Sequence, residues 1–403
     1  MAAIKEILIT QKSQDDSVSP VDDNQSETVE KKQTELLEQK RLEESSQAEP
    51  EITRDQLSLS KQLLNWRTLV PLIIVIVAVI FFVQKLHIDP QKTWAAIRSA
   101  NFIFLLAAFV VYYLSFAIRA ARWRILLENV GFTKANGVEL PKFWKLTEII
   151  YISWFVNSIV PAKLGDLYRA YLLRQESGVS ATRTFGTIMA ERLLDLIVLL
   201  LLFIPALIIS LHAHLPLVLR GGLEVTLAAV VVGMAALFIM RQFPTQIARL
   251  IPERFRRYFY QFQEGTLGSF KHIPTLIGLT FGVWACEVLR FFFVAAALNL
   301  IAGDPLHVIT AACFIALGEA LLTVVPLTGG GVGLVEAGML AMIALFNQGT
   351  ANALNVTTAA ILLDRTISYS SVIVFGFIVF MLAFGRQATK RAKNLDTKQE
   401  AGL

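Results

Sequence analysis

The chain has 403 residues, of which 55% are hydrophobic and 17% are charged, with a formal net charge of +5. Together with apolar runs long enough to cross a bilayer, this composition excludes an ordinary water-soluble domain and predicts an all-α, polytopic membrane protein. Two cysteines and five scattered histidines predict neither a disulfide framework nor a metal site. We therefore expect no metal and no cofactor. No nucleic-acid motif is present either, so we expect no nucleic-acid partner.

Residues 1–60 form an acidic segment, with 7 Lys and Arg against 14 Asp and Glu, and therefore a net charge of −7. The segment has no apolar core of the kind found in secretory signals, and its composition predicts a disordered acidic cytoplasmic tail. Residues 61–385 are expected to form the membrane domain. Residues 386–403 follow it as a basic cytoplasmic tail.

The apolar segments are of two kinds. About six are expected to be full spans, at 68–85, 102–126, 184–210, 217–240, 275–300 and 353–384. Two others, 143–177 and 306–347, are interrupted by proline and glycine, at Pro161–Gly165 and Pro326–Gly333. Because broken helical backbone cannot face lipid, each interruption must be packed in protein or line a polar cavity. A matched pair of breaks in the two halves of a chain predicts a transporter-like binding site.

Basic residues near the span ends predict the orientation of the chain. The basic segments are 119–145 (Arg119, Arg122, Arg124, Lys134, Lys142 and Lys145), 241–272 (Arg241, Arg249, Arg254, Arg256, Arg257 and Lys271) and 386–393. All three are assigned to the cytoplasm, as are both termini. Segment 143–177 then begins and ends on the cytoplasmic side, and 306–347 begins and ends on the outer side. Both are therefore predicted to be re-entrant helical hairpins, with each half too short to cross alone.

The order of these elements predicts an inverted repeat. Repeat 1 covers about 102–210 and repeat 2 about 275–384, each built from a span, a hairpin and a second span. The two repeats have opposite orientations in the membrane. A weak sequence echo agrees with this arrangement, because the span after each hairpin carries an acidic residue followed by arginine, at Glu191-Arg192 and Asp364-Arg365.

Charged residues inside the apolar segments are candidates either for function or for helix packing. They are Glu191, Arg192, Asp195, Glu287, Arg290, Glu319, Asp364 and Arg365. Each costs roughly 2.5–3.5 kcal/mol on insertion scales, so each requires a partner or a water-filled cavity. Glu191 and Asp195 are four residues apart and are expected to share a helix face. Two interpretations stay open and can both hold: ion pairs that lock the helices together, or a polar pathway for a charged headgroup or a coupling ion.

The first break carries a candidate anion site, composed of Asn157, Pro161, Lys163, Gly165, Asp166 and Arg169. Asp166 and Arg169 are spaced to pair on one helix face. If Pro161–Gly165 is the turn, the next half-helix offers backbone N–H groups that, together with Lys163, would hold a phosphate. The alternative for Lys163 is that its side chain extends to the cytoplasmic interface.

The second break contains a run of glycines, Gly329, Gly330, Gly331 and Gly333, followed by Glu336. No Lys-Ser/Thr pair follows the run and no strand precedes it, so a nucleotide-binding loop is not expected. The glycines instead permit a tight turn and close backbone approach inside the membrane. Glu336 is expected either to cap the returning half-helix or to act as a protonatable group.

These residues resemble a known family. The matching motifs are Asn157-x3-Pro161-x3-Gly165-Asp166-x2-Arg169, Glu191-Arg192-Leu-Leu-Asp195 and Pro326-x2-Gly329-Gly330-x2-Gly333-x2-Glu336. They are similar to the membrane domain of lysylphosphatidylglycerol synthases, and the resemblance covers about residues 65–385. Asp166 stands where glutamate is common in that family, and Lys163 stands where arginine is common. Both differences keep the charge.

The resemblance implies a lipid-translocating membrane domain. With the two breaks it leads to our primary hypothesis, a lipid flippase of the cytoplasmic (inner) membrane that moves a polar, anionic headgroup through a cavity between the two hairpins. In the fused members of the family a separate soluble domain transfers the aminoacyl group. Only residues 386–403 follow the last predicted span here, so we expect no enzymatic activity. Membrane lipids are the expected partners, and the oligomeric state is left open.

Two other functions stay open. The first is a non-transporting, lipid-binding accessory protein of a membrane-lipid or cell-envelope biosynthesis pathway, with the acidic tail docking a biosynthetic enzyme. The second is an intramembrane enzyme that acts on lipid headgroups. It fits less well, because no metal cluster or nucleophile–base spacing stands out in the sequence.

Overall fold

The computed structural model describes residues 89–160, 163–210, 217–324, 329–346 and 353–383. The chain divides after Asn65, and all described residues belong to the second unit, Trp66–Leu403. The described residues are helical with no strand, which confirms the predicted all-α class. The predicted acidic tail, the span at 68–85, the two break prolines (Pro161 and Pro326) and the basic tail lie outside the described residues.

In chain order the helices are α5 (Pro90–Ser99), α6 (Phe102–Asn129), a short 3-10 turn (Lys134–Asn136), α7 (Phe143–Ile159), α8 (Leu164–Ser177), α9 (Ala181–Ser210), α10 (Leu217–Gln242), α11 (Pro244–Leu250), α12 (Glu253–Gly268), α13 (Ile273–Ala297), α14 (Pro305–Leu322), a 3-10 turn (Gly329–Gly331), α15 (Leu334–Ala344) and α16 (Ala353–Arg365). The helix of α16 continues through a π-helical turn, Thr366–Ser370, to Ala383. Local signals explain several helix ends. Asp89 accepts hydrogen bonds from two backbone N–H groups at the start of α5, and Gly178, with a φ of 66°, ends α8.

Six helices in the described part of the chain are long and apolar enough to cross a membrane. They are Phe102–Asn129, Ala181–Ser210, Leu219–Gln242, Ile273–Ala297, Pro305–Leu322 and Ala353–Ala383. Five of them agree with predicted full spans to within a few residues. The remaining one is α14, whose 18 residues reach the length of a span. The expectation that neither half of 306–347 is long enough to cross is therefore wrong for α14.

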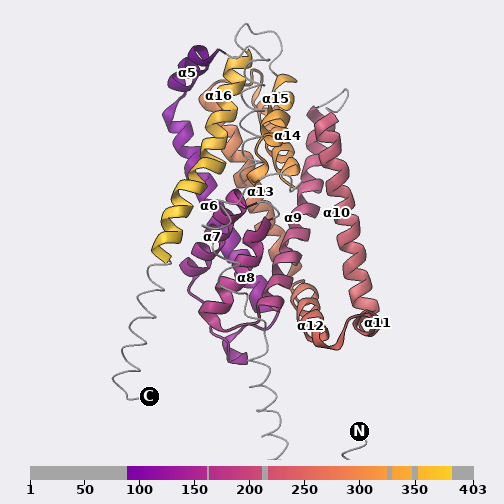
Figure 1. Ribbon diagram of the computed structural model, residues 1–403. Helices are drawn as coiled ribbons and strands as arrows, with labels where there is room; N and C mark the ends of the chain where they lie inside the picture. Colours follow the sequence, from indigo (N-terminus) through magenta and orange to yellow (C-terminus); the bar gives the residue numbers. More distant parts are fainter. Residues whose placement is uncertain (1–88, 161–162, 211–216, 325–328, 347–352, 384–403) are drawn as a thin grey trace, which may run out of the picture. The chain divides into compact units, whose positions relative to one another are not determined.

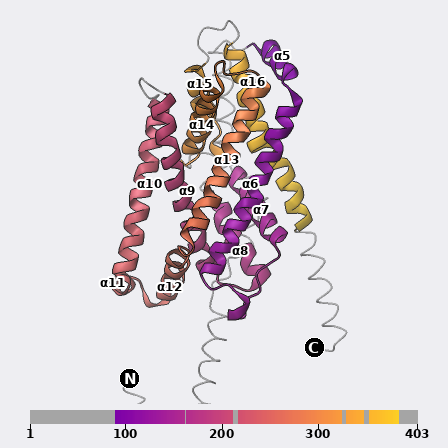
Figure 2. The same ribbon diagram turned by 180° about the vertical axis from the view of Figure 1, so that it is seen from behind.

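Two pairs of consecutive helices lie toward opposite ends of this unit (Figure 1). Helix α7 packs against α8 at one end, and α14 packs against α15 at the other. The view from behind shows the same separation (Figure 2). Longer helices pass between the two pairs, and α6 and α13 pack along each other. Side chains of α6, α9, α13 and α16 can therefore meet between the two pairs.

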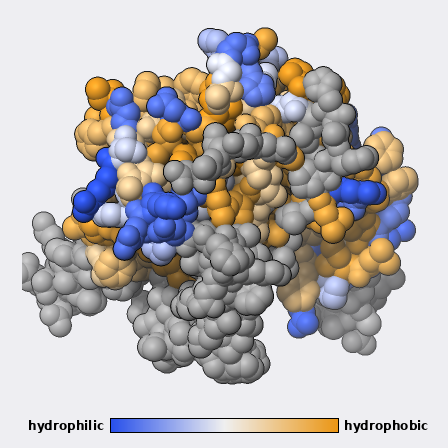
Figure 3. All heavy atoms as spheres, turned by 90° about the horizontal axis from the view of Figure 1, so that it is seen from above, coloured by the Kyte–Doolittle hydropathy of each residue, from blue (hydrophilic) through white to orange (hydrophobic). Residues whose placement is uncertain are grey.

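Helix α10 directs most of its apolar surface outward. Only 6% of its most apolar part is buried, and Val231, Val232 and Phe238 are largely exposed. Seen from the end at which α5 lies, hydrophobic residues also reach the outer edge of the molecule (Figure 3). Lipid tails are as apolar as these side chains, so such a surface is stable in a bilayer. The described residues thus form a multi-pass membrane protein.

Two glycines bring α12 close to α9. A Cβ atom on Gly265 would lie 2.1 Å from the carbonyl oxygen of Arg183, and one on Gly186 would lie 2.5 Å from the carbonyl oxygen of Phe262. Small residues at such a crossing allow the two backbones to approach each other. The crossing fixes α11 and α12 at the same end of the unit as the connection between α6 and α7 (Figure 1).

Candidate functional site

A cluster of ion pairs surrounds Arg122, which is buried among the helices of the membrane domain. Arg122 is 0% exposed, and its guanidinium donates hydrogen bonds to Glu191 Oε1 at 2.8 Å and to Asp195 Oδ1 at 2.5 Å. It also donates to the hydroxyl of Thr280 at 2.9 Å. Glu191 and Asp195 therefore share one face of α9, as their spacing predicts. Both carboxylates bind the same cation of α6.

Helix α8 contributes two further members of this cluster. Arg192 holds Asp166 with two hydrogen bonds, from Nε at 2.9 Å and from Nη2 at 2.7 Å. Arg169 forms an ion pair with Glu191 at 2.9 Å, and its guanidinium lies 3.8 Å from the centre of the Trp123 ring. The expected pairing of Asp166 with Arg169 along α8 is therefore replaced by pairing across to α9. We call the six charged residues the α9 network: Arg122, Asp166, Arg169, Glu191, Arg192 and Asp195.

The turn between α7 and α8 is fixed by Asn157. Its side-chain oxygen accepts a hydrogen bond from the backbone N–H of Gly165 at 2.8 Å, and its amide nitrogen donates to Asp166 Oδ1 at 3.1 Å. A Cβ atom on Gly165 would lie 2.1 Å from the carbonyl oxygen of Ser153, which explains the glycine. Of the N–H groups expected to be free for an anion, that of Gly165 is therefore occupied.

A second cluster surrounds Arg290, which is 2% exposed. Its guanidinium donates to Glu319 Oε2 at 2.8 Å, to Asp364 Oδ1, and to Glu287 Oε2 at 3.3 Å. Arg119 donates to the other oxygen of Glu287 at 2.8 Å. These contacts join α6, α13, α14 and α16.

Arg365 extends the second cluster to the glycine run. It donates to Glu336 Oε1 at 2.7 Å and to the carbonyl oxygen of Gly330 at 2.8 Å. The other oxygen of Glu336 accepts a hydrogen bond from the N–H of Gly333 at 2.5 Å, so Glu336 caps α15 as one of the two expectations proposes. We call the seven charged residues the α16 network: Arg119, Glu287, Arg290, Glu319, Glu336, Asp364 and Arg365.

The glycine run adopts backbone conformations that L-amino acids with side chains rarely adopt. Gly330, Gly331 and Gly333 have φ values of 62°, 71° and 91°. A Cβ atom on Gly330 would lie 2.2 Å from Cε2 of Tyr369. Both the turn and the close approach predicted for this run are therefore present at Gly330. Gly329 belongs to the same 3-10 turn.

The two networks share one pattern of connections. In the first, Glu191 of α9 pairs with Arg122 of α6, and the next residue, Arg192, pairs with Asp166 in the first turn of α8. In the second, Asp364 of α16 pairs with an arginine of α13, Arg290. The next residue, Arg365, pairs with Glu336 in the first turn of α15. The repeated pair of an acidic residue followed by arginine, Glu191-Arg192 and Asp364-Arg365, therefore makes equivalent ion pairs in the two halves of the chain.

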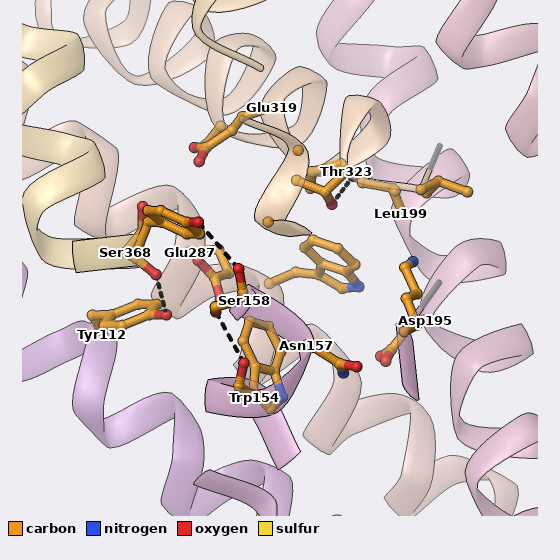
Figure 4. Close-up of a pocket in the computed structure, with 18 of the residues that line it drawn as sticks. Tyr112, Trp154, Asn157, Ser158, Asp195, Leu199, Glu287, Glu319, Thr323 and Ser368 are labelled. Atoms are coloured by element: carbon orange, nitrogen blue, oxygen red, sulfur yellow. Dashed lines mark hydrogen bonds between the residues drawn. The ribbon is translucent and has the colours of Figure 1, made fainter. Parts of the chain in front are cut away.

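A cavity of about 210 Å³ lies between the two networks and is bordered by both break segments. Its charged lining consists of Arg119, Lys163, Arg192, Arg290, Arg365, Asp195, Glu287 and Glu319. Its aromatic lining consists of Tyr112, Trp154, Trp284 and Tyr369. Figure 4 shows Glu319 and Thr323 on one side of the cavity and Trp154 and Asn157 on the opposite side. The cavity thus combines helices of both halves of the chain.

Lys163 differs from the other basic residues of the cavity. It precedes α8 in a left-handed conformation with a φ of 53°, and its side chain lines the cavity. Its ammonium group makes no hydrogen bond or ion pair with any described residue. The arginines of the lining all bind carboxylates. Lys163 is therefore a cation held at the cavity with no carboxylate in direct contact among the described residues, while Asp166 and Asp195 act on it from a longer distance.

Sequence reasoning missed several residues of the site. Arg119 and Arg122, assigned to a cytoplasmic basic segment, are 6% and 0% exposed and belong to the two networks. The assignment is wrong for these two residues because α6 continues to Asn129. The helical spacing of Tyr112, Phe116, Arg119 and Arg122 is the signal that could have placed both arginines on one buried helix face. No comparable signal marks Tyr369.

The fold and the cavity define a multi-pass membrane protein with a charged, buried site. The family described as "Lysylphosphatidylglycerol synthase TM region" matches residues 69–376, so the chain belongs to this family and the predicted resemblance is confirmed.

Three relatives illustrate the family. A UPF0104 membrane protein of Methanocaldococcus jannaschii is 32% identical over 246 residues, which cover 60% of this chain and 98% of that protein. A UPF0104 membrane protein of Methanothermobacter thermautotrophicus is 24% identical over 356 residues, 81% of this chain and 95% of that protein. Glycosyltransferase AglD of Haloferax volcanii is 25% identical over 329 residues, 73% of this chain but only 51% of that protein. No solved structure matches the chain.

Proposed function

We propose that this protein is a lipid flippase that moves a polar, anionic headgroup across the cytoplasmic membrane through the cavity. The observation that carries the proposal is the position of Lys163, a cation with no carboxylate in direct contact among the described residues, at a cavity bordered by both break segments. An anion entering the cavity would supply the charge that Lys163 lacks. The surrounding apolar helices would leave the acyl chains in lipid while the headgroup moves.

We also propose that α7–α8 and α14–α15 are re-entrant hairpins related by an inverted repeat. The shared connections of the α9 and α16 networks support the repeat, as does the location of the two helix pairs toward opposite ends of the unit (Figure 1). Helices α7 and α8 have 17 and 14 residues, and α14 and α15 have 18 and 11, so one helix of each pair is clearly shorter than a span. At 1.5 Å per residue, α8 and α15 span roughly 16–21 Å, less than a hydrocarbon core of about 30 Å.

The end of the unit that carries α11 and α12 would face the cytoplasm. Burial removes Arg119 and Arg122 from the charges that support this orientation. Lys134 and Lys142 remain near the start of α7, and the arginines of α11 and α12 lie at the same end (Figure 1). Clusters of basic residues at one end favour the cytoplasmic side.

In this mechanism the ion pairs of the two networks fix the helices that form the cavity walls, and the headgroup binds in the cavity. Arg192 is engaged by Asp166 and Arg365 by Glu336, so neither guanidinium is fully available to a ligand. Lys163 would therefore be the main contact for the anion. Trp284, whose buried Nε1–H group has no hydrogen-bond partner among the described residues, would offer a further donor on the cavity wall.

The test is headgroup translocation in phosphatidylcholine vesicles that contain the purified full-length protein. Fluorescent phosphatidylglycerol and fluorescent phosphatidylcholine would be compared, with a membrane-impermeant quencher reporting which leaflet holds the label. We expect the protein to accelerate movement of the anionic lipid more than that of the zwitterionic lipid. Protein-free vesicles give the background rate.

Failure of the protein to accelerate any lipid, including labelled lipids from a native extract, would contradict a flippase. It would favour the non-transporting accessory function instead. Deletion of residues 1–60 separates the two functions, because an accessory protein that docks an enzyme through this segment would lose its function. A flippase built as proposed would keep translocation.

A further inference from the structure

The two networks differ in charge balance. The α9 network contains three arginines and three carboxylates, and each carboxylate has a cation within 3.0 Å. The α16 network contains three arginines but four carboxylates. Two of its arginines have a close carboxylate of their own, Arg119 with Glu287 at 2.8 Å and Arg365 with Glu336 at 2.7 Å.

The excess negative charge lies at Arg290. Its guanidinium contacts three carboxylates: Nη1 faces Asp364, Nη2 faces Glu319, and Nε lies 3.3 Å from Glu287, which has Arg119 as its closer partner. The distance from Arg365 Nη1 to Glu319 is 3.7 Å, longer than its contact with Glu336. Arg122 also faces two carboxylates, but Arg169 is a second cation for one of them, Glu191. Arg290 is thus the closest cation of two buried acids, Asp364 and Glu319.

Of the two acids, Asp364 has fewer positive and hydrogen-bonding groups around its carboxylate to offset its negative charge. Its side chain is 0% exposed, and its Oδ2 atom accepts no hydrogen bond from any described residue. Burying an uncompensated carboxylate in a low-dielectric site is strongly unfavourable. One bound proton would bring the α16 network to three charges of each sign and remove this penalty.

Glu319 connects this pair to the cavity. It binds the same guanidinium as Asp364, and its side chain lines the cavity, where Figure 4 shows it. A proton could therefore reach Asp364 from the cavity by way of Glu319. The groups that face the pair are Arg119 and Tyr112 of α6, Glu287 and Arg290 of α13, Glu336 of α15 and Arg365 of α16, with Asp195 of α9 and Lys163 on the far side of the cavity.

We propose that Asp364 and Glu319, joined by Arg290, bind one exchangeable proton, and that this proton is the coupling ion for headgroup movement. The inference rests on the proposed flippase function. An anion in the cavity adds negative charge beside Glu319, so its binding favours proton binding, and by reciprocity the proton favours anion binding. Headgroup and proton would then cross in the same direction.

The experiment applies a pH gradient across phosphatidylcholine vesicles that contain the full-length protein and labelled phosphatidylglycerol, with the membrane potential clamped to zero. One proton moved with one anionic headgroup predicts that the label accumulates in the leaflet on the alkaline side. At equilibrium the accumulation would be about tenfold per pH unit, because one unit corresponds to about 1.4 kcal/mol. A protonophore would abolish it.

Asp364→Asn and Glu319→Gln test the assignment, because each removes the excess carboxylate and keeps a polar group for Arg290. We expect both variants to lose the accumulation on the alkaline side, measured against each variant's own rate of lipid movement without a gradient. Glu128→Gln, in the exposed pair with Arg124, is the matched control and would keep the wild-type response. A wild-type protein that moves lipid but ignores the gradient would overturn the coupling and leave the flippase function intact.

A second readout is independent of transport. Infrared difference spectra of the purified protein across a pH titration would show a protonated-carboxyl band in wild type that both variants weaken or lose. If no lipid moves in the vesicles, the flippase function fails, and the infrared titration still decides whether the proton site exists. Identical bands in wild type and both variants would overturn the site.

Discussion

The hydroxyl group of Tyr369 donates a hydrogen bond to the carbonyl oxygen of Ser158 at 3.1 Å. The contact joins the π-helical turn that follows α16 to the end of α7, across 211 positions of sequence. The Tyr369 ring lies directly against Gly330, and the guanidinium of Arg365 lies 4.8 Å from its centre. A single side chain thus touches both break segments at the cavity. Any opening of the cavity between them must change the contacts of Tyr369.

The contact between Gly330 and Tyr369 predicts a specific coupling between two substitutions. Gly330→Ala places a Cβ atom 2.2 Å from the tyrosine ring on a backbone with a φ of 62°, so it should lower stability by about 1–3 kcal/mol. Combining it with Tyr369→Ala removes the clash but not the backbone strain. The double variant should therefore be less destabilised than the sum of the single variants. Thermal unfolding of the detergent-purified proteins measures this, and strict additivity would show that the two residues do not touch.

The burial of Arg122 predicts a large effect on folding. Arg122→Met leaves Glu191 and Asp195 without their shared cation, and removing one partner of a buried pair typically costs about 3–5 kcal/mol. The control is Arg124→Met, two positions along α6. Arg124 pairs with Glu128 near the surface, where such pairs contribute roughly 0–1 kcal/mol. Equal melting temperatures for the two variants would contradict the buried location of Arg122.

Two glycine substitutions are predicted to have opposite effects, one at the crossing of α9 and α12 and one at an open position of α13. A Cβ atom on Gly265 would lie 2.1 Å from the backbone oxygen of Arg183, so Gly265→Ala should push the helices apart and destabilise the protein. Gly278 of α13 has no atom within 4 Å of the corresponding position. Gly278→Ala should be neutral or stabilising by up to about 1 kcal/mol, because alanine favours helix. Loss of purified, monodisperse protein for Gly278→Ala alone would be inconsistent with this packing.

Much of the fold follows from apolar length and from the break residues. Spans of 20 or so apolar residues must cross as helices, and Gly165 and Gly330 mark real close approaches of backbone. The ion-pair partners of the buried charged residues do not follow from the sequence. Spacing along α8 makes Asp166 and Arg169 neighbours, but α9 offers each a better partner, and sequence spacing carries no information about a facing helix.

Two features of the site lay beyond sequence reasoning for other reasons. Counting charges near span ends cannot distinguish a loop arginine from a buried one, so Arg119 and Arg122 were placed in the cytoplasm. Tyr369 has an ordinary helical context in the sequence. Only the meeting of both break segments gives it a role, and that meeting is a property of the tertiary structure.

An anion site at Lys163 is tested by the initial rate of phosphatidylglycerol translocation for a series of charge substitutions at this position. Wild type, Lys163→Arg, Lys163→Ala and Lys163→Glu would be compared in vesicles, with Lys134→Glu, an exposed loop substitution, as the control. Arginine should keep most of the rate, alanine should lower it and glutamate should lower it furthest, while the control keeps the wild-type rate. Equal rates across the four residues at position 163, in folded protein, would contradict an anion site at this lysine.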